Sequence, residues 1–185
     1  MSVYNDLFPL GPDTTEYRRV GEGFESQFLS AQSLGDTNML VIKDEALRLM
    51  ADEAFRDINH YLRASHLQQL RDILEDDEAS ANDRFVALEY LKNASIAAAG
   101  VLPMCQDTGT AIILGKKGKN VFVDGDEEGA LAQGVMDAYA KNNLRYSQLA
   151  PLSMFEEQNT RNNLPAQIDL MSEGVDTYTF LTIAK

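Results

Sequence analysis

The chain has 185 residues, of which 44% are hydrophobic and 24% charged, and its formal net charge at pH 7 is −13. This composition is typical of a globular protein that is long enough to bury a hydrophobic core. The excess of acidic residues argues against nucleic acid as a partner, the lack of any apolar run of about 18 residues argues against a membrane span, and the single cysteine excludes an internal disulfide framework.

An irregular arm or loose hairpin is expected over residues 1–43, where turn-forming residues are frequent and hydrophobic periodicity is weak. The segment ends in the strand-like "MLVI". Its opening, "MSVYNDLFPLGPD", has neither the basic flank nor the apolar core of a secretory leader. Together with the lone cysteine, this predicts a cytoplasmic protein.

Three helices are predicted between residues 44 and 100. The first runs to about residue 62, the second begins near residue 66 and ends in the acidic turn "EDDEAS", and the third follows Ser80. Ser80 is a good N-cap, and Asp83 in the first turn favours the helix dipole. Gly100 and Pro103 end the third helix. The residues expected to face the core are Leu47, Met50, Ala54, Ile58 and Tyr61 in the first helix, Leu67, Leu70, Ile73 and Leu74 in the second, and Phe85, Leu88, Leu91, Ser95 and Ile96 in the third.

The later part of the chain mixes strands with one helix. "TAIILG" and "NVFV" predict a β-hairpin with "KKGK" as its solvated tip, and Asp124 or Asp126 is expected to cap the next helix. "PAQIDLM" and "YTFLTIAK" predict two further strands around "SEGVDT". The fold class is therefore α+β: an amino-terminal helical layer of about three helices, followed by a mixed part with a β-hairpin, one helix and two further strands. The expected inward residues of the later helix are Ala130, Leu131, Val135, Ala138 and Tyr139.

The only cysteine, Cys105, lies in the loop segment "VLPMCQDTGTAI". With Gln106, Asp107 and Thr108 it offers a soft metal ligand, a hydrogen-bonding amide, and a proton donor or acceptor. Loops at strand ends commonly carry functional side chains. The residues alone leave an alternative open, which is an inert structural cysteine beside a turn-forming Asp-Thr-Gly.

Histidine and arginine are two other residue types in the chain that can form a site. His60 and His66 are six residues apart, which places them on different helix faces, so they cannot share a metal ion and are expected to be surface or capping histidines. Arg145 follows the later helix. Its guanidinium can hold a carboxylate through two parallel hydrogen bonds, or it can complement the helix dipole. The amide-rich "NTRNNLPAQID" predicts a structured loop.

Several strings, in this order and spacing, resemble the amino-terminal part of class I fumarate hydratases, the oxygen-sensitive iron–sulfur fumarases that are related to tartrate dehydratases. The strings are "LPMCQDTGTAI", "GKKG", "LRYSQLAPLSMFEEQNT", "NNLPAQID" and "FLTIAK". The similarity is specific because these uncommon strings recur together. It divides the chain into an arm over residues 1–43 and a fumarase-like region over residues 44–185.

The resemblance implies reversible addition of water to fumarate to give (S)-malate, as in the tricarboxylic acid cycle. It also implies a [4Fe-4S] cluster held by three cysteines, with one iron open to act as a Lewis acid on the substrate hydroxyl. Cys105 matches the first cluster ligand, and Gln106 and Asp107 match substrate contacts. Asp107 is in addition a candidate acid or base, and Arg145 matches a clamp for a substrate carboxylate. The implied partners are a small dicarboxylate and, for the full-length enzyme, a second copy in a homodimer.

The sequence also departs from that family. It has one cysteine, and it lacks the glycine-rich "GGGSANK" that the family places after "IAK", as well as the carboxy-terminal domain. One thiolate cannot assemble the cluster. We therefore expect a portion truncated within a domain at Lys185, inactive and without a cluster when alone. Two alternatives stay open: a related dehydratase acting on tartrate or another 2-hydroxy dicarboxylate, and a non-catalytic standalone assembly module.

Overall fold

The computed structural model describes residues 25–185, so the part of the expected arm within residues 1–24 lies outside the described residues. The helices are α1 (Glu25–Phe28), α2 (Asp44–His60), α3 (Ala64–Glu75), α4 (Ala81–Ala97) and α5 (Glu127–Lys141). The strands are β1 (Leu29–Leu34), β2 (Thr37–Lys43), β3 (Ala111–Gly118), β4 (Val121–Asp124), β5 (Leu149–Pro151), β6 (Glu157–Asn159), β7 (Gln167–Glu173) and β8 (Tyr178–Ala184). The predicted α+β class is confirmed.

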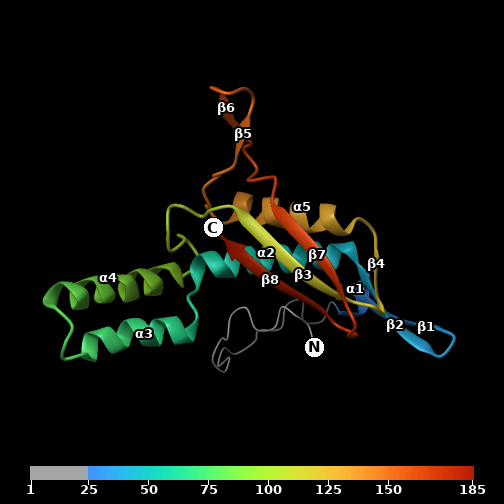
Figure 1. Ribbon diagram of the computed structural model, residues 1–185, viewed down its shortest axis with the longest axis horizontal. Coiled ribbons are helices and arrows are strands. Elements are labelled where there is room, and N and C mark those ends of the chain that lie inside the picture. The colour runs from blue at the N-terminus through green and yellow to red at the C-terminus, as the bar shows by residue number, and fades with distance from the viewer. Residues whose placement is uncertain (1–24) are drawn as a thin grey trace.

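The centre of the fold is a three-stranded sheet of order β7-β3-β8, in which β3 runs parallel to β7 and antiparallel to β8. Helices α2 and α5 lie side by side across one face of this sheet (Figure 1). Side chains alternate along β3, which turns Ala111 and Ile113 into the core, where both are fully buried. Phe55 from α2 and Leu131 from α5 fill the space between the layers. Burial of one such large side chain contributes about 1.5–3 kcal/mol.

Strands β3 and β4 are consecutive, but they do not form the predicted hairpin. β3 pairs with β7 and β8, whereas β4 pairs in parallel with β2 in a second sheet of order β1-β2-β4. Two lysines expected at a solvated tip lie in β3, where Lys117 binds Glu127 at 2.9 Å and Lys116 lies 3.9 Å from Glu173. The hairpin prediction was wrong because a short glycine-containing link matches the local signature of a hairpin, while the choice of partner depends on strands elsewhere in the chain.

Helices α2 and α5 approach each other closely at Gly134. A methyl group at this position would lie 2.7 Å from the Cβ atom of Ala51, and closer still to the carbonyl oxygen of Arg48. The glycine therefore lets the two helix backbones pack directly against each other. The inward face predicted for α5 is confirmed: Ala130 packs against the core, and the buried residues of the helix include Leu131, Val135, Ala138 and Tyr139.

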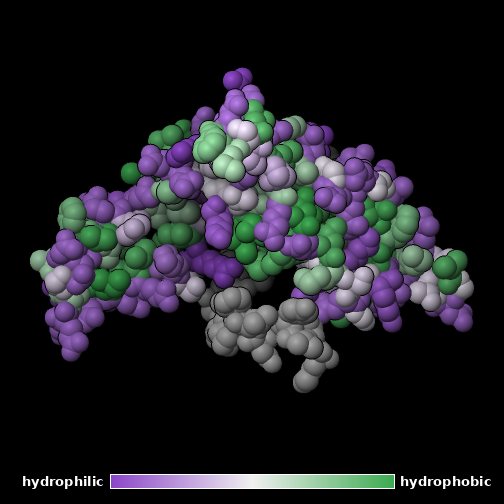
Figure 2. All heavy atoms as spheres, turned by 45° about the horizontal axis from the view of Figure 1, so that its top comes forward, coloured by the Kyte–Doolittle hydropathy of each residue, from purple (hydrophilic) through white to green (hydrophobic). Residues whose placement is uncertain are grey.

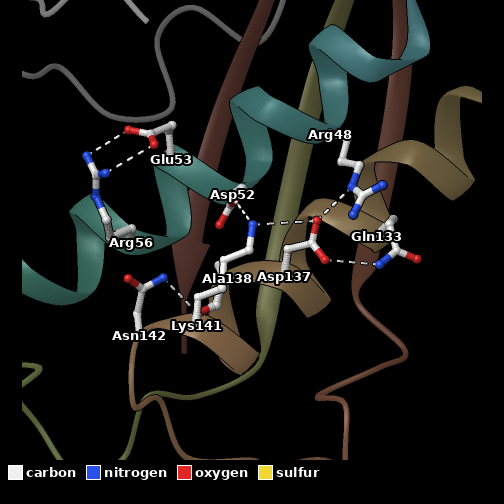
Figure 3. Close-up of polar contacts among 9 residues, drawn as sticks. All are labelled: Arg48, Asp52, Glu53, Arg56, Gln133, Asp137, Ala138, Lys141 and Asn142. Carbon is white, nitrogen blue, oxygen red and sulfur yellow. Dashed lines mark hydrogen bonds and ion pairs between the residues drawn. The ribbon is translucent and has the colours of Figure 1, made fainter. Parts of the chain in front are cut away.

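Ion pairs join the same two helices at their solvent edge (Figure 3). Arg48 Nε lies 2.6 Å from Asp137 Oδ2, and Lys141 Nζ lies 2.6 Å from Asp52 Oδ2. The hydrogen bond from Arg48 is the main cause that lowers the pKa of Asp137. Arg48 and Lys141 are partly open to water, so each pair contributes little to stability.

The residues buried along α2 follow a face that differs from the predicted stripe. Leu47 is buried as expected, but Ala51 and Phe55 are fully buried and Tyr61 is 51% exposed. His60 is buried rather than at the surface, and its Nδ1 proton is donated to the carbonyl oxygen of Arg56 at 2.7 Å, which agrees with the capping alternative. The periodicity located the helix, and the packing of α5 decided its orientation.

Helices α3 and α4 form a hairpin that extends away from the sheet (Figure 1). Its second helix starts as predicted: Ser80 Oγ accepts from the Asp83 amide at 3.1 Å, and Asp83 Oδ2 accepts from the Ser80 amide at 2.9 Å. The predicted inward face of α4 was wrong, because Phe85 is 60% and Ile96 62% exposed while Ala87 is buried. The large apolar side chains of α4 are distributed around all sides of the helix, so their spacing does not identify which face is buried. Hydrophobic side chains accordingly reach the surface of the α3–α4 hairpin, at the left of Figure 2.

Two smaller hairpins complete the described part. β1 and β2 pair antiparallel, as expected for the end of the amino-terminal segment, and the β5–β6 hairpin projects at the top of Figure 1. Within residues 25–185, no helix combines the length and the apolar character that are needed to cross a lipid bilayer.

Candidate functional site

The Cys105 loop, residues 98–110, leads from α4 into β3, and its last residues are fixed firmly. Thr110 N donates to Lys185 O at 2.6 Å, and Lys185 N donates to Thr110 O at 3.0 Å, so the loop enters the sheet beside the end of β8. Gly109 has a φ of 73° and lies against the backbone of Lys185, where a side chain has no room. The conformation at the end of the loop therefore requires glycine.

The three polar side chains that the sequence singled out lie on the open side of this loop. Cys105, Gln106 and Asp107 are all exposed, whereas Thr108 directly after them is 2% exposed. The buried threonine anchors the loop and leaves the preceding thiol, amide and carboxylate facing solvent. This arrangement rules out the alternative of a structural cysteine sealed in the core.

The structure brings the segment of Arg145 to the same place. Arg145 N donates to Thr108 Oγ1 at 2.8 Å, and Thr108 Oγ1 donates to Arg145 O at 3.0 Å. Ser147 Oγ lies 3.4 Å from Asp107 Oδ1. Arg145 itself is exposed. The predicted site residues are thus collected from two segments that are far apart in sequence.

A buried tyrosine lies beneath the loop. Tyr139, in the last turns of α5, is 1% exposed, and its hydroxyl donates to the carbonyl oxygens of Thr108 at 2.5 Å and Gly109 at 2.9 Å. Burial raises the pKa of Tyr139 to about 12, and the negative charge of Asp107 adds to that rise. The hydroxyl therefore stays protonated at neutral pH and acts as a fixed donor.

The donor set can be compared with the cluster that the sequence suggests. An exposed thiol in a loop can become a thiolate ligand to a soft metal. In the part of the chain that the structure describes, no three His, Cys, Asp or Glu side chains are grouped so that they could hold a metal ion. The exposed thiol of Cys105 therefore suits a single thiolate ligand, and the sequence supplies no second cysteine beside it.

Sequence reasoning missed part of this site. Tyr139 was assigned to the core by its periodicity, but its hydroxyl also binds the Cys105 loop. Asn163 was treated as part of a structured loop, yet it is fully buried, accepts from Ser147 N and donates to Gly109 O. The available signal was the Asn-Asn pair before Leu-Pro, since asparagine tolerates the left-handed backbone found there. His66 is exposed and has no part in the site.

The comparisons with known proteins agree on one family. The sequence model of the family Fumarate hydratase (Fumerase) matches residues 49–185. The chain is 52% identical to the aerobic class I fumarate hydratase of Escherichia coli strain K12 over 182 residues, which are 98% of this chain and 32% of that protein. It is 49% identical to the anaerobic class I enzyme of the same strain, over 99% of this chain and 33% of that protein. It is 50% identical to the mitochondrial fumarate hydratase 1 of Leishmania major, over 92% of this chain and 31% of that protein. The chain thus spans about a third of the length of the curated relatives that it matches.

Proposed function

Because this chain belongs to the fumarate hydratase (Fumerase) family, we propose that it forms the amino-terminal part of a class I fumarate hydratase, which adds water reversibly to fumarate to give (S)-malate. One observation carries the proposal. The buried Thr108 hydroxyl ties the exposed Cys105 loop to the backbone of Arg145, so that a thiol, an amide, a carboxylate and a guanidinium come from two joined segments. A small dicarboxylate needs such a combination of an anion clamp with groups for proton and hydroxide transfer.

The side chains of this chain have distinct tasks in that reaction. The planar fork of Arg145 binds one substrate carboxylate through two parallel hydrogen bonds. The amide of Gln106 donates a hydrogen bond to a substrate oxygen. Loss of water from malate removes a proton from the carbon next to a carboxylate, and donors at that carboxylate stabilise the charge that develops there. Asp107 contacts the substrate and is a candidate to accept or return a proton.

Cys105 is assigned as one of three cysteine ligands of a [4Fe-4S] cluster, with the other two supplied by polypeptide that this chain does not contain. When bound, the cluster supplies a Lewis acid that makes the substrate hydroxyl a better leaving group. Because the chain holds one cysteine, we expect it to bind no cluster and to have no hydratase activity alone. The complete enzyme is proposed to be a cytoplasmic homodimer.

The proposal is tested with a chimera in which this chain replaces the matching segment of the Escherichia coli aerobic enzyme. The chimera is reconstituted with iron and sulfide without oxygen and assayed with fumarate and malate. Arg145→Lys should raise KM for both acids about 10-fold or more, because lysine cannot bind a carboxylate with a planar fork. The matched control is Arg161→Lys, at an exposed arginine in a neighbouring loop. A cluster-loaded chimera that hydrates no fumarate but dehydrates tartrate would replace the proposed activity by the alternative one.

A further inference from the structure

The side-chain amide of Asn163 is fully buried, and it accepts one hydrogen bond and donates another. Its Oδ1 accepts from Ser147 N at 2.8 Å, and its Nδ2 donates to Gly109 O at 3.0 Å. Ser147 lies two residues after Arg145, and Gly109 ends the Cys105 loop. One side-chain amide therefore spans the two segments from which the proposed site is built.

The chemistry of this bridge suits asparagine and few other residues. A side chain of this length must donate and accept at once, which excludes a carboxylate and any apolar group. The backbone of Asn163 has a φ of 58°, a left-handed conformation that favours glycine or asparagine. A buried group that holds an uncommon backbone conformation and satisfies both of its polar ends points to a constraint on the structure around it.

The Gly109 carbonyl is the point where these constraints meet. It accepts from Asn163 Nδ2 at 3.0 Å and from Tyr139 Oη at 2.9 Å, which uses both lone pairs of the oxygen. The Thr108 hydroxyl forms a separate link from the same loop to Arg145. Removal of the Asn163 amide therefore leaves the loop attached through Thr108 and Tyr139, and Gln148 Nε2 still donates to Thr110 Oγ1 at 2.5 Å, but Ser147 N loses its hydrogen-bond acceptor.

We propose that Asn163 is a positioning residue, whose buried amide sets the Cys105 loop against the Arg145 segment and so fixes the spacing of the groups that meet the substrate. The catalytic part of this inference rests on the proposed hydratase function. The positional part concerns the backbone of the 185-residue chain and is measurable without a cluster or a substrate.

The first test compares Asn163→Gly with Asn143→Gly in the 185-residue chain. Both positions have left-handed backbones, with φ of 58° and 55°, so glycine removes the side chain without backbone strain in either case. Asn143 is exposed, and its amide makes one long bond of 3.2 Å to Val101 O. Amide hydrogen exchange of Ser147 and alkylation of Cys105 by iodoacetamide should become several-fold faster in Asn163→Gly and stay near the native rates in Asn143→Gly. Exchange and alkylation rates in Asn163→Gly that equal those of the native chain would overturn the proposal.

A second variant keeps the shape of the side chain. A protonated carboxyl at this position can still donate to Gly109 O and accept from Ser147 N, whereas a carboxylate cannot donate. In Asn163→Asp, the Ser147 exchange rate relative to the native chain at the same pH should be close to one in acid and should rise as the pH increases. A ratio that does not change with pH would contradict the bridging role.

The third measurement uses the cluster-loaded chimera. Asn163→Gly should raise KM for fumarate and lower kcat/KM about 10- to 100-fold, because a displacement of about 1 Å between binding groups has effects of this size. A purely structural role would lower the amount of active enzyme and leave KM unchanged, and that result would overturn the positioning role. If the native chimera shows no hydratase activity, the proposed function fails, while the exchange and alkylation rates still decide whether Asn163 joins the two segments.

Discussion

Substitution of Gly134 by alanine tests how tightly α2 and α5 are packed beneath the site. Alanine is favoured over glycine inside a helix by about 1 kcal/mol, so propensity alone predicts stabilisation. Here the added methyl group would lie 2.7 Å from Ala51 Cβ and even closer to the Arg48 carbonyl oxygen, whereas carbon atoms in contact are about 3.5–4 Å apart. The Arg48 oxygen is a backbone atom and Ala51 Cβ is bonded directly to the backbone, so neither atom can rotate away from the added methyl group.

The two effects have opposite signs, and the clash should win. Overpacking of a closely packed interface costs about 1–3 kcal/mol and at times more, and here the helices must also separate along their whole contact. We expect a net loss of about 2 kcal/mol, which for a chain of this length lowers Tm by about 4–8 °C. The control is Gly174→Ala, where a methyl group has no neighbour within 4 Å. Thermal and urea unfolding of both variants give the answer, and a Gly134→Ala chain as stable as the native one would refute the close approach of the helices.

Three further predictions concern single side chains. The pKa of Tyr139 is about 12 in the fold and about 10 in the unfolded chain, so its protonated hydroxyl stabilises the fold fully below pH 10, and this stabilisation is lost as the pH rises through 12. The native chain should therefore lose about 1–3 kcal/mol of unfolding free energy in alkali that Tyr139→Phe does not lose. Urea midpoints of both chains at pH 8 and 11 measure the difference. Asp107→Asn should lower kcat of the chimera about 100-fold or more if this carboxylate transfers a proton; in the isolated chain it should lower the pKa of Tyr139, which ultraviolet titration measures, because the charge of Asp107 helps to raise it. Ser80→Ala removes an N-cap and should destabilise α4 by about 1 kcal/mol, seen as faster amide exchange in its first turn.

The sequence predicted most of the helices and strands. Amphipathic spacing, the Ser80 cap and the Gly100 stop located the helices, because these signals act within a few residues along the chain. Pairing between distant strands carries no such local signal, so the link between β3 and β4 was misread as a hairpin. In α4, apolar residues on several sides left the choice of face to tertiary packing, and Phe85 was placed inward although it is exposed.

The site was predicted unevenly for a similar reason. Cys105, Gln106 and Asp107 are adjacent in sequence, and their chemistry was visible there. The proximity of Arg145 rests on the Thr108 hydroxyl and on the bridge of Asn163, which depend on the fold of two separate loops. Such hydrogen bonds can be predicted only when the fold is known, because the fold determines which polar groups are buried and must have a partner inside the protein.

We propose that the exposed sulfur of Cys105 anchors an inorganic cofactor, in the loop that carries Asp107 and is hydrogen-bonded to the backbone of Arg145. The most direct measurement is the iron and acid-labile sulfide content of the anaerobically reconstituted chimera, with the native loop and with Cys105→Ser. The native loop should give a full cluster and hydratase activity, and the serine variant should lose both, because a serine hydroxyl is a poor ligand for iron in a sulfide cluster. A serine variant that keeps its iron, its sulfide and its rate of malate formation would contradict the assignment.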